Sequence, residues 1–102
     1  MQNNIIVRAE AEAELSEAYD WYNVRMVGLG DQFFMSVDAT IQAISRNPNQ
    51  FPEIYKTIRR ALIHRFPYAI FFVVEESQII ILAIFHAKRN PKQWKERFKS
   101  SF

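Results

Sequence analysis

The sequence predicts an α+β fold with the element order β-α-α-β-β-β and a short basic helix at its C-terminal end. The main observation is a change of period, because apolar residues recur at steps of three and four in the first half and every second position from Ile58 onward. A second observation is size. At 102 residues, 49% of them apolar, the chain can bury one core, so we expect residues 1–102 to form a single domain.

The first half is expected to form a short N-terminal strand and a helical hairpin. The strand falls within residues 3–8, and the first helix covers residues 10–27, where glutamates surround an apolar stripe. Gly28 is placed to end this helix in a left-handed conformation, and Asp31 to cap a second helix that stops at Asn47. So short a connection makes the helices antiparallel, with their apolar stripes facing each other and a common sheet.

The second half is expected to supply a twisted antiparallel sheet. A period of two covers residues 58–65, Pro67 interrupts it, and a further strand follows over residues 70–75. Residues 79–85 are apolar throughout, as in a strand covered on both faces, so we expect them at the centre of the sheet. The intervening Glu76 and Ser77 should form a tight turn.

Charge is distributed unevenly along the chain. Residues 1–50 hold three basic and seven acidic side chains, a net charge of −4, whereas residues 51–102 hold ten basic and four acidic ones, a net charge of +6. Part of this excess lies in residues 91–102, which open with proline and should form the basic helix. The asymmetry predicts an acidic partner, nucleic acid or protein, unless the two halves simply attract each other.

Several kinds of chemistry lack the residues they need. The chain has no cysteine, which excludes disulfides and thiol nucleophiles, and His64 and His86 lack the spacing of a zinc helix, so we expect no metal and no cofactor. No serine has a Gly-x-Ser-x-Gly context. Glu10, Glu14 and Glu17 are expected to form a solvated helix face rather than an acid/base pair.

The chain also carries no sign of a membrane or secretory address. Its N-terminus lacks the basic and apolar regions of a signal peptide, and no apolar run approaches the roughly 18 residues of a membrane helix. We therefore expect a cytoplasmic protein with no membrane partner.

Cations interleaved with rings are the remaining candidates for function. Arginine offers a planar, permanently charged fork to phosphate or carboxylate, and a neighbouring ring can stack on a base. Strand alternation nevertheless sends Arg59 and Arg65 to the face opposite Arg60, so the whole set cannot converge on one ligand. A solvated sheet edge is the competing interpretation. The set comprises Arg59, Arg60, Arg65, Lys88, Arg89, Lys92 and Lys95, with Tyr68, His86 and Trp94.

The order and spacing of several segments over residues 5–94 resemble the RelE/ParE superfamily of type II toxin–antitoxin toxins, often called plasmid stabilisation proteins. The resemblance implies a helical hairpin packed on an antiparallel sheet. The segments are Ala9-Glu-Ala-Glu-Ala-Glu-Leu15, Ala18-Tyr-Asp-Trp-Tyr22, Gly28-Leu-Gly-Asp-Gln-Phe33, Asn47-Pro-Asn-Gln-Phe-Pro52, Ile58-Arg-Arg-Ala-Leu62, Arg65-Phe-Pro-Tyr68 and His86-Ala-Lys-Arg-Asn-Pro91, followed by Trp94.

Two activities are known in that superfamily. RelE-like members cut messenger RNA in the ribosome with a cluster of basic residues, and ParE-like members poison DNA gyrase without being nucleases. Arg60 and Arg89 fall at two of the basic positions, but Leu62 and Ala69 stand where further cations are expected. Trp94, which cannot act as an acid or base, lies near the position of a C-terminal tyrosine. The resemblance therefore favours the ParE-like side.

These observations predict a toxin that inhibits growth by binding a target, with DNA gyrase as the expected target, and that an acidic antitoxin neutralises. The residues expected to bind the target are Arg60, Arg65, His86, Lys88, Arg89 and Trp94. Aromatic residues on the hairpin and sheet exceed what one small core is expected to hide, so we expect an exposed groove for the antitoxin. Its expected residues are Tyr19, Trp21, Phe33 and Phe51.

Two alternative functions stay open at this level. The first is a RelE-like endoribonuclease that acts on the ribosome and its messenger RNA, with Arg60, His86 and Arg89 as the catalytic candidates. The second is a degenerate toxin that only binds its antitoxin and helps it repress their operon.

Overall fold

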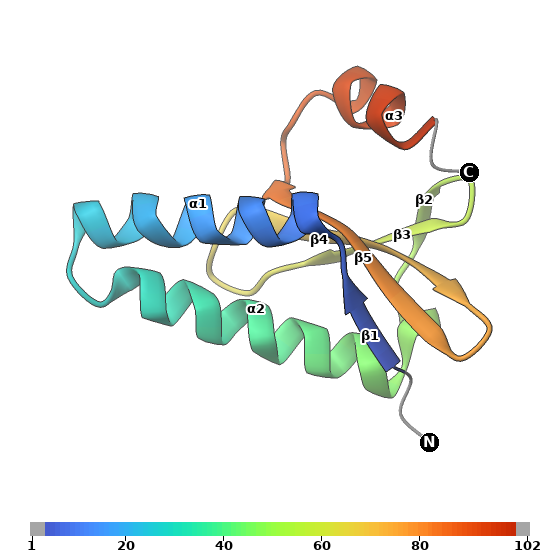
Figure 1. Ribbon diagram of the computed structural model, residues 1–102, viewed down its shortest axis with the longest axis horizontal. Helices are drawn as coiled ribbons and strands as arrows, with labels where there is room; N and C mark the ends of the chain where they lie inside the picture. The colour runs from blue at the N-terminus through green and yellow to red at the C-terminus, as the bar shows by residue number, and fades with distance from the viewer. Residues whose placement is uncertain (1–3, 100–102) are drawn as a thin grey trace.

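A computed structural model describes residues 4–99 (Figure 1). The expected strand, helical hairpin, strands and basic helix all form. Two short elements were not expected, the 3₁₀ helix η1 and the strand β2. In chain order the elements are β1 (Asn4–Val7), α1 (Ala9–Arg25), α2 (Leu29–Arg46), the 3₁₀ helix η1 (Pro48–Gln50), β2 (Glu53–Tyr55), β3 (Ile58–Leu62), β4 (Tyr68–Glu75), β5 (Gln78–His86) and α3 (Pro91–Lys99).

The five strands form one mixed sheet in the order β1-β5-β4-β3-β2. Strands β2 to β5 pair antiparallel, as expected, whereas β1 runs parallel to β5, with Asn4 opposite Gln78 and Val7 opposite Ile81. The central strand is β4, so the expectation that residues 79–85 occupy the centre is wrong by one place. These residues are nevertheless interior, because β1 covers the outer edge of the first half of β5.

The hairpin is held by a close approach of its two helices. Gly28 is left-handed at φ +90°, as predicted, but it directly precedes α2, and Asp31 lies inside the first turn rather than at the cap. Gly30 donates its N–H to Asn23 Oδ1 at 2.8 Å. A Cβ at Gly30 would stand 2.5 Å from the backbone oxygen of Tyr19, so only glycine permits this approach.

Helices cover both faces of the sheet, and each face has its own core. Phe33, Val37 and Ile44 of α2 pack with residues of α1 and one face of the sheet. On the other face α3 contributes Trp94 and Phe98, which pack on β3, β4 and β5. Figure 1 places α1 and α3 on different sides of the sheet. This arrangement explains why β4 and β5 are apolar without alternation.

The strand boundaries depart from expectation around the turns. β3 ends at Leu62 rather than residue 65, and β4 begins at Tyr68 rather than residue 70, because the chain reverses between them. Arg65 in this turn has φ +74°, and Glu76 in the expected Glu76–Ser77 turn has φ +54°, positions where glycine is usual. The helix expected over residues 91–102 is present as α3, which ends at Lys99. Residues 100–102 lie outside the described range. No helix within residues 4–99 has both the length and the apolar character to cross a membrane.

Candidate functional site

A pocket of about 690 Å³ opens where the end of β5 faces α1. This volume lies within the range of small-ligand and side-chain pockets. One wall comes from α1 and the other from β5 and the loop that follows it. The lining residues are Glu14, Glu17, Ala18 and Trp21 of α1, Tyr68 of β4, and Ile84, Phe85, His86, Lys88 and Arg89.

The basic wall is shaped by a tight turn after β5. The Arg89 N–H donates to the His86 carbonyl at 3.0 Å, and the Lys88 N–H donates to His86 Nδ1 at 3.1 Å. Because Nδ1 accepts, the neutral His86 ring carries its proton on Nε2. The turn ends at Pro91, the first residue of α3. Three side chains able to donate hydrogen bonds are thus gathered within four residues.

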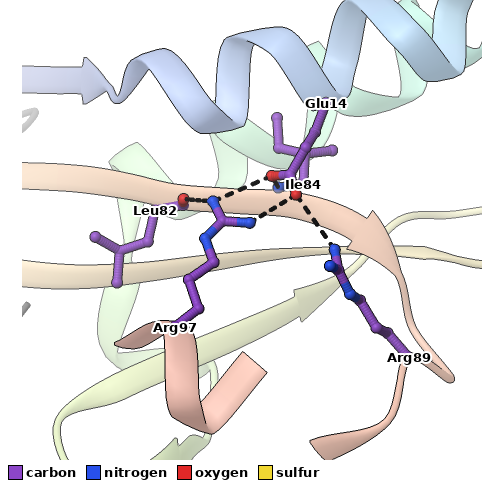
Figure 2. Close-up of polar contacts among 5 residues, drawn as sticks. All are labelled: Glu14, Leu82, Ile84, Arg89 and Arg97. Atoms are coloured by element: carbon purple, nitrogen blue, oxygen red, sulfur yellow. Dashed lines mark hydrogen bonds and ion pairs between the residues drawn. The ribbon is translucent and has the colours of Figure 1, made fainter. Parts of the chain in front are cut away.

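Glu14 anchors the acidic wall and is not the solvated helix residue that we expected. Its carboxylate accepts from Arg97 Nη1 at 2.7 Å and Nη2 at 3.3 Å, and from the Ile84 N–H at 3.1 Å (Figure 2). Arg97 also donates to the Leu82 carbonyl at 2.7 Å. One carboxylate therefore connects α1, β5 and α3 beside the pocket.

Arg89 belongs to this group only loosely. Its Nη1 lies 3.4 Å from Glu14 Oε2, and its guanidinium carbon lies 4.6 Å from the centroid of the Phe85 ring. The Arg89 side chain is 41% exposed, against 26% for Arg97. Since Arg97 and Ile84 already satisfy the Glu14 carboxylate, Arg89 can turn to an external anion without leaving Glu14 unpaired.

Two aromatic rings complete the pocket. Burial raises the pKa of the Tyr68 phenol above its ordinary value, and the Glu17 carboxylate raises it further, so the hydroxyl stays protonated as a donor. Trp21 is 47% exposed, and the Arg25 guanidinium lies 3.2 Å from its ring centroid. The pocket thus combines the cations of the loop after β5 with Glu14, Glu17 and Trp21 of α1, and with the hydroxyl of Tyr68 on β4.

The structure brings together three of the six residues expected to bind the target: His86, Lys88 and Arg89. Arg65 lies at a second groove, and Arg60 lies on β3, which β4 separates from β5. Trp94 is only 6% exposed and packs against Tyr55, Phe71 and Phe98, so it anchors α3 rather than offering a free surface. The RelE-like set is likewise split, with His86 and Arg89 in the pocket and Arg60 apart from them.

The four residues expected to meet an antitoxin do not form one surface. Phe33 is completely buried in the hairpin core, which contradicts its expected exposure. Tyr19 donates its hydroxyl to Asp31 Oδ1 at 2.6 Å, and this bond raises the Tyr19 pKa. Trp21 lies at the first pocket and Phe51 at the second groove. Aromatic residues fill the two cores more completely than the sequence suggested.

The second groove, of about 560 Å³, runs between α2 and the end of β3. Its floor is mostly apolar, and two exposed apolar side chains contribute to it, Met35 at 70% and Leu62 at 63%. Basic or polar side chains border it. The lining residues are Gln32, Met35, Ser36, Ala39, Thr40, Ala43, Gln50, Phe51, Leu62, His64 and Arg65.

Sequence reasoning missed Arg97 and the structural part of Glu14. Glu14 follows Glu10 by four residues in an acidic helix, and nothing local distinguishes the two. Arg97 belongs to a helix rich in cations. Only the pairing of a helix residue with a residue 83 positions away reveals their role. Among residues 4–99, no three histidine or acidic side chains gather as a metal site would require.

Together, the two-helix hairpin on a mixed sheet and the basic turn after β5 define a small α+β protein with a polar pocket between the hairpin and that turn. Residues 5–91 match the ParE toxin of the type II toxin–antitoxin system parDE. The chain therefore belongs to the ParE toxin family, within the RelE/ParE superfamily that its sequence resembles.

Individual relatives agree with this assignment. Toxin ParE2 of Mycobacterium tuberculosis, in the CDC 1551 / Oshkosh and H37Rv strains, is 28% identical over 92 residues, which are 89% of this chain and 88% of the relative. The chromosomal ParDE system of P. aeruginosa matches with a TM-score of 0.74 and 21% identity, over 83% of this chain and 96% of that one. The RelBE2 toxin–antitoxin complex of M. tuberculosis matches with a TM-score of 0.54 and 12% identity, over 84% and 99%. These two structural likenesses concern the fold.

Proposed function

We propose that this toxin inhibits growth by binding a cytoplasmic target, DNA gyrase, through its basic turn of residues 86–89, and that a cognate acidic antitoxin neutralises it. The observation that carries the proposal is the convergence of His86, Lys88 and Arg89 on one pocket. Arg89 is the central residue, because it is half exposed and not needed to satisfy Glu14. Such a module would stabilise the replicon that encodes it.

The residues around Arg60 on its face of the sheet favour target binding over RNA cleavage as the activity. Metal-free phosphodiester cleavage needs several cations around one phosphate, each worth about 2–4 kcal/mol in the transition state. Ala69 is completely buried on this side, Leu62 is uncharged, and α3 covers the adjoining strands with Trp94. Arg60 therefore has no cation beside it at positions 62 and 69, where the RelE-like pattern has them.

The decisive test is Arg89→Ala in a growth assay under inducible expression. We expect growth inhibition to be lost while circular dichroism and antitoxin binding stay as in the wild type. Lys56→Ala, in the β2–β3 turn outside both pockets, is the matched control and should remain toxic. A folded Arg89→Ala variant that stays fully toxic would place target recognition elsewhere, most plausibly on the helical hairpin.

Two assays in parallel distinguish the activities. The purified toxin should inhibit gyrase supercoiling and should not cut messenger RNA on translating ribosomes above background. Codon-dependent cleavage that disappears in Arg89→Ala would instead establish the RelE-like alternative. A wild-type protein that inhibits neither system nor growth, yet binds its antitoxin, would be the degenerate toxin.

The antitoxin is assigned to the second groove in this proposal. An amphipathic segment can cover Met35, Phe51 and Leu62 with its apolar side, and its acidic side can face Arg65. Relatives of this fold are described as toxin–antitoxin systems, which supports such a partner. Met35→Glu should weaken antitoxin binding, because it adds a negative charge to the groove that repels the acidic antitoxin. Val27→Glu changes an apolar side chain that is 96% exposed and outside the groove, and should not.

A further inference from the structure

The outer edge of β5 is covered only in part by β1. Their pairing runs from Asn4 with Gln78 to Val7 with Ile81, and the Arg8 N–H then donates to the Ile81 carbonyl at 3.0 Å. The chain turns into α1 at Ala9. Beyond Ile81, β5 therefore has β4 on one side and no strand on the other.

Beyond Ile81, side chains rather than a strand bond the next two backbone groups on this edge of β5. Arg97 donates to the Leu82 carbonyl, and Glu14 accepts from the Ile84 N–H, both across the edge that β1 has left (Figure 2). The Ile84 N–H is the last backbone group on this edge that these two side chains bond. The part of β5 that follows lines the pocket.

The next two edge groups are the Ile84 carbonyl and the His86 N–H. Successive residues of a strand direct their backbone groups to opposite edges. The Ile84 N–H points to Glu14, and the Ala87 N–H points the other way to the Pro67 carbonyl at 2.9 Å. The Ile84 carbonyl and the His86 N–H thus face the α1 side, and neither has a hydrogen-bond partner within residues 4–99.

This pair has the spacing of a parallel β-bridge. In a parallel ladder, one residue donates its N–H to the residue before its opposite and accepts from the residue after it. For a residue opposite Phe85, these partners are the Ile84 carbonyl and the His86 N–H. A closely spaced antiparallel pair centred on Ile84 or His86 is blocked, because the Ile84 N–H and the His86 carbonyl already have partners. The same two groups can bond an antiparallel segment through the residues on either side of the one opposite Phe85, so the open edge accepts an extended segment in either direction.

The surroundings specify the side chains of such a segment. Lys88 and Arg89 border the edge on the loop side and attract a carboxylate. Glu17 on the α1 wall repels one, so it confines the carboxylate to the loop side. Ala18 and Trp21 offer an apolar wall for a neighbouring side chain. A nucleic acid has phosphates for the cations but no backbone N–H for the Ile84 carbonyl.

We propose that the open edge of β5 binds an extended acidic segment of the growth-inhibition target by one β-bridge at Phe85, with a carboxylate on Arg89 and Lys88. This rests on the proposed role of residues 86–89 in target binding. It adds the form of the ligand, an extended peptide rather than a helix or a nucleic acid.

The test compares His86→Pro with His86→Ala. Both variants lose the imidazole, but only proline removes the N–H, which at this edge makes no ladder bond. The probe is an acetylated, amidated pentapeptide of alternating aspartate and valine, titrated into the full chain by NMR. We expect His86→Pro to bind it about three- to tenfold more weakly than His86→Ala, the loss of one hydrogen bond. Urea unfolding checks that both variants are folded.

A measurement on the peptide does not depend on the folding of His86→Pro. N-methylation of the peptide at each position in turn removes the N–H for the Ile84 carbonyl at one of them, and that methylation should weaken binding to the wild-type chain by a similar factor. In growth assays, equal toxicity of folded His86→Pro and His86→Ala would overturn the bridge, although loss of toxicity in Arg89→Ala would still support the proposed function. A single-stranded RNA oligonucleotide that displaces the peptide and binds all variants alike would assign the pocket to nucleic acid.

Discussion

The Glu14 carboxylate and the Arg97 guanidinium lie 2.7 Å apart, although 83 positions separate them in the chain. Their contact closes the edge of β5 where β1 ends, because each also bonds a backbone group of that strand. The pair connects the hairpin on one face of the sheet to α3 on the other. It thereby supports the loop of residues 86–89 from both ends.

Removing either member of this pair should destabilise the fold. Glu14→Ala leaves the Ile84 N–H without its acceptor and Arg97 without its carboxylate partner, and Arg97→Ala leaves the Leu82 carbonyl without its donor, so we expect each to cost about 1–3 kcal/mol in urea unfolding. The double variant should cost less than the two single effects combined. Glu10→Ala, an exposed residue one turn earlier, should change stability by less than about 0.5 kcal/mol. Equal effects at Glu10 and Glu14 would contradict this role.

Truncating Trp94 should release α3 from the sheet. The ring is nearly buried among Tyr55, Phe71 and Phe98, so Trp94→Ala should cost about 3–5 kcal/mol, measured by chemical denaturation. Gln93→Ala, its exposed neighbour, is the control and should change stability little. Near-UV circular dichroism should also lose intensity in Trp94→Ala. A Trp94→Ala protein as stable as Gln93→Ala would mean that α3 does not depend on this anchor.

The two glycines of the hairpin should differ in their tolerance of alanine. At Gly30 a Cβ meets the Tyr19 backbone oxygen and the Asn23 side chain, whereas at Gly28 nothing lies within 4 Å. Gly28→Ala carries only the strain of its positive φ, about 1–2 kcal/mol. Gly30→Ala must move α1 and α2 apart and should cost about 1–3 kcal/mol, with loss of the Asn23 bond in addition. Thermal unfolding of the two variants decides the ranking, and a more stable Gly30→Ala would contradict it.

Stability should fall in alkaline solution through Tyr22 and Tyr68. Burial raises the pKa of both phenols above the ordinary value of 10.0, so the folded state holds these protons more tightly than the unfolded state. Their contribution is complete below pH 10.0 and is lost as pH rises through the folded pKa values. A Tyr22→Phe, Tyr68→Phe variant should therefore lose less stability over this alkaline range than the wild type does. Identical slopes would show that other groups control the alkaline limb.

Local patterns were sufficient to predict most of the elements. The helical stripe, Gly28 at the reversal and the apolar run of β5 each express a constraint that acts within a few residues, and the structure has the corresponding elements. Their ends were less well predicted at β3 and β4, because the turn between them depends on how the strands pack. η1 was missed because the prolines and asparagines of residues 47–52 favour a loop by composition, and β2 because three residues are too few to show a period.

The sequence alone also indicated the basic turn, because His86, Lys88 and Arg89 are neighbours in the chain and any fold would keep them together. Trp94, expected at the target-binding surface, instead anchors α3, where few other apolar residues are present. Only the tertiary structure decided which distant residues these side chains contact. The parallel pairing of β1 with β5, the burial of Phe33 and the contact of Glu14 with Arg97 join positions far apart in the chain. Such contacts depend on how whole faces pack, a choice that no local period or spacing encodes.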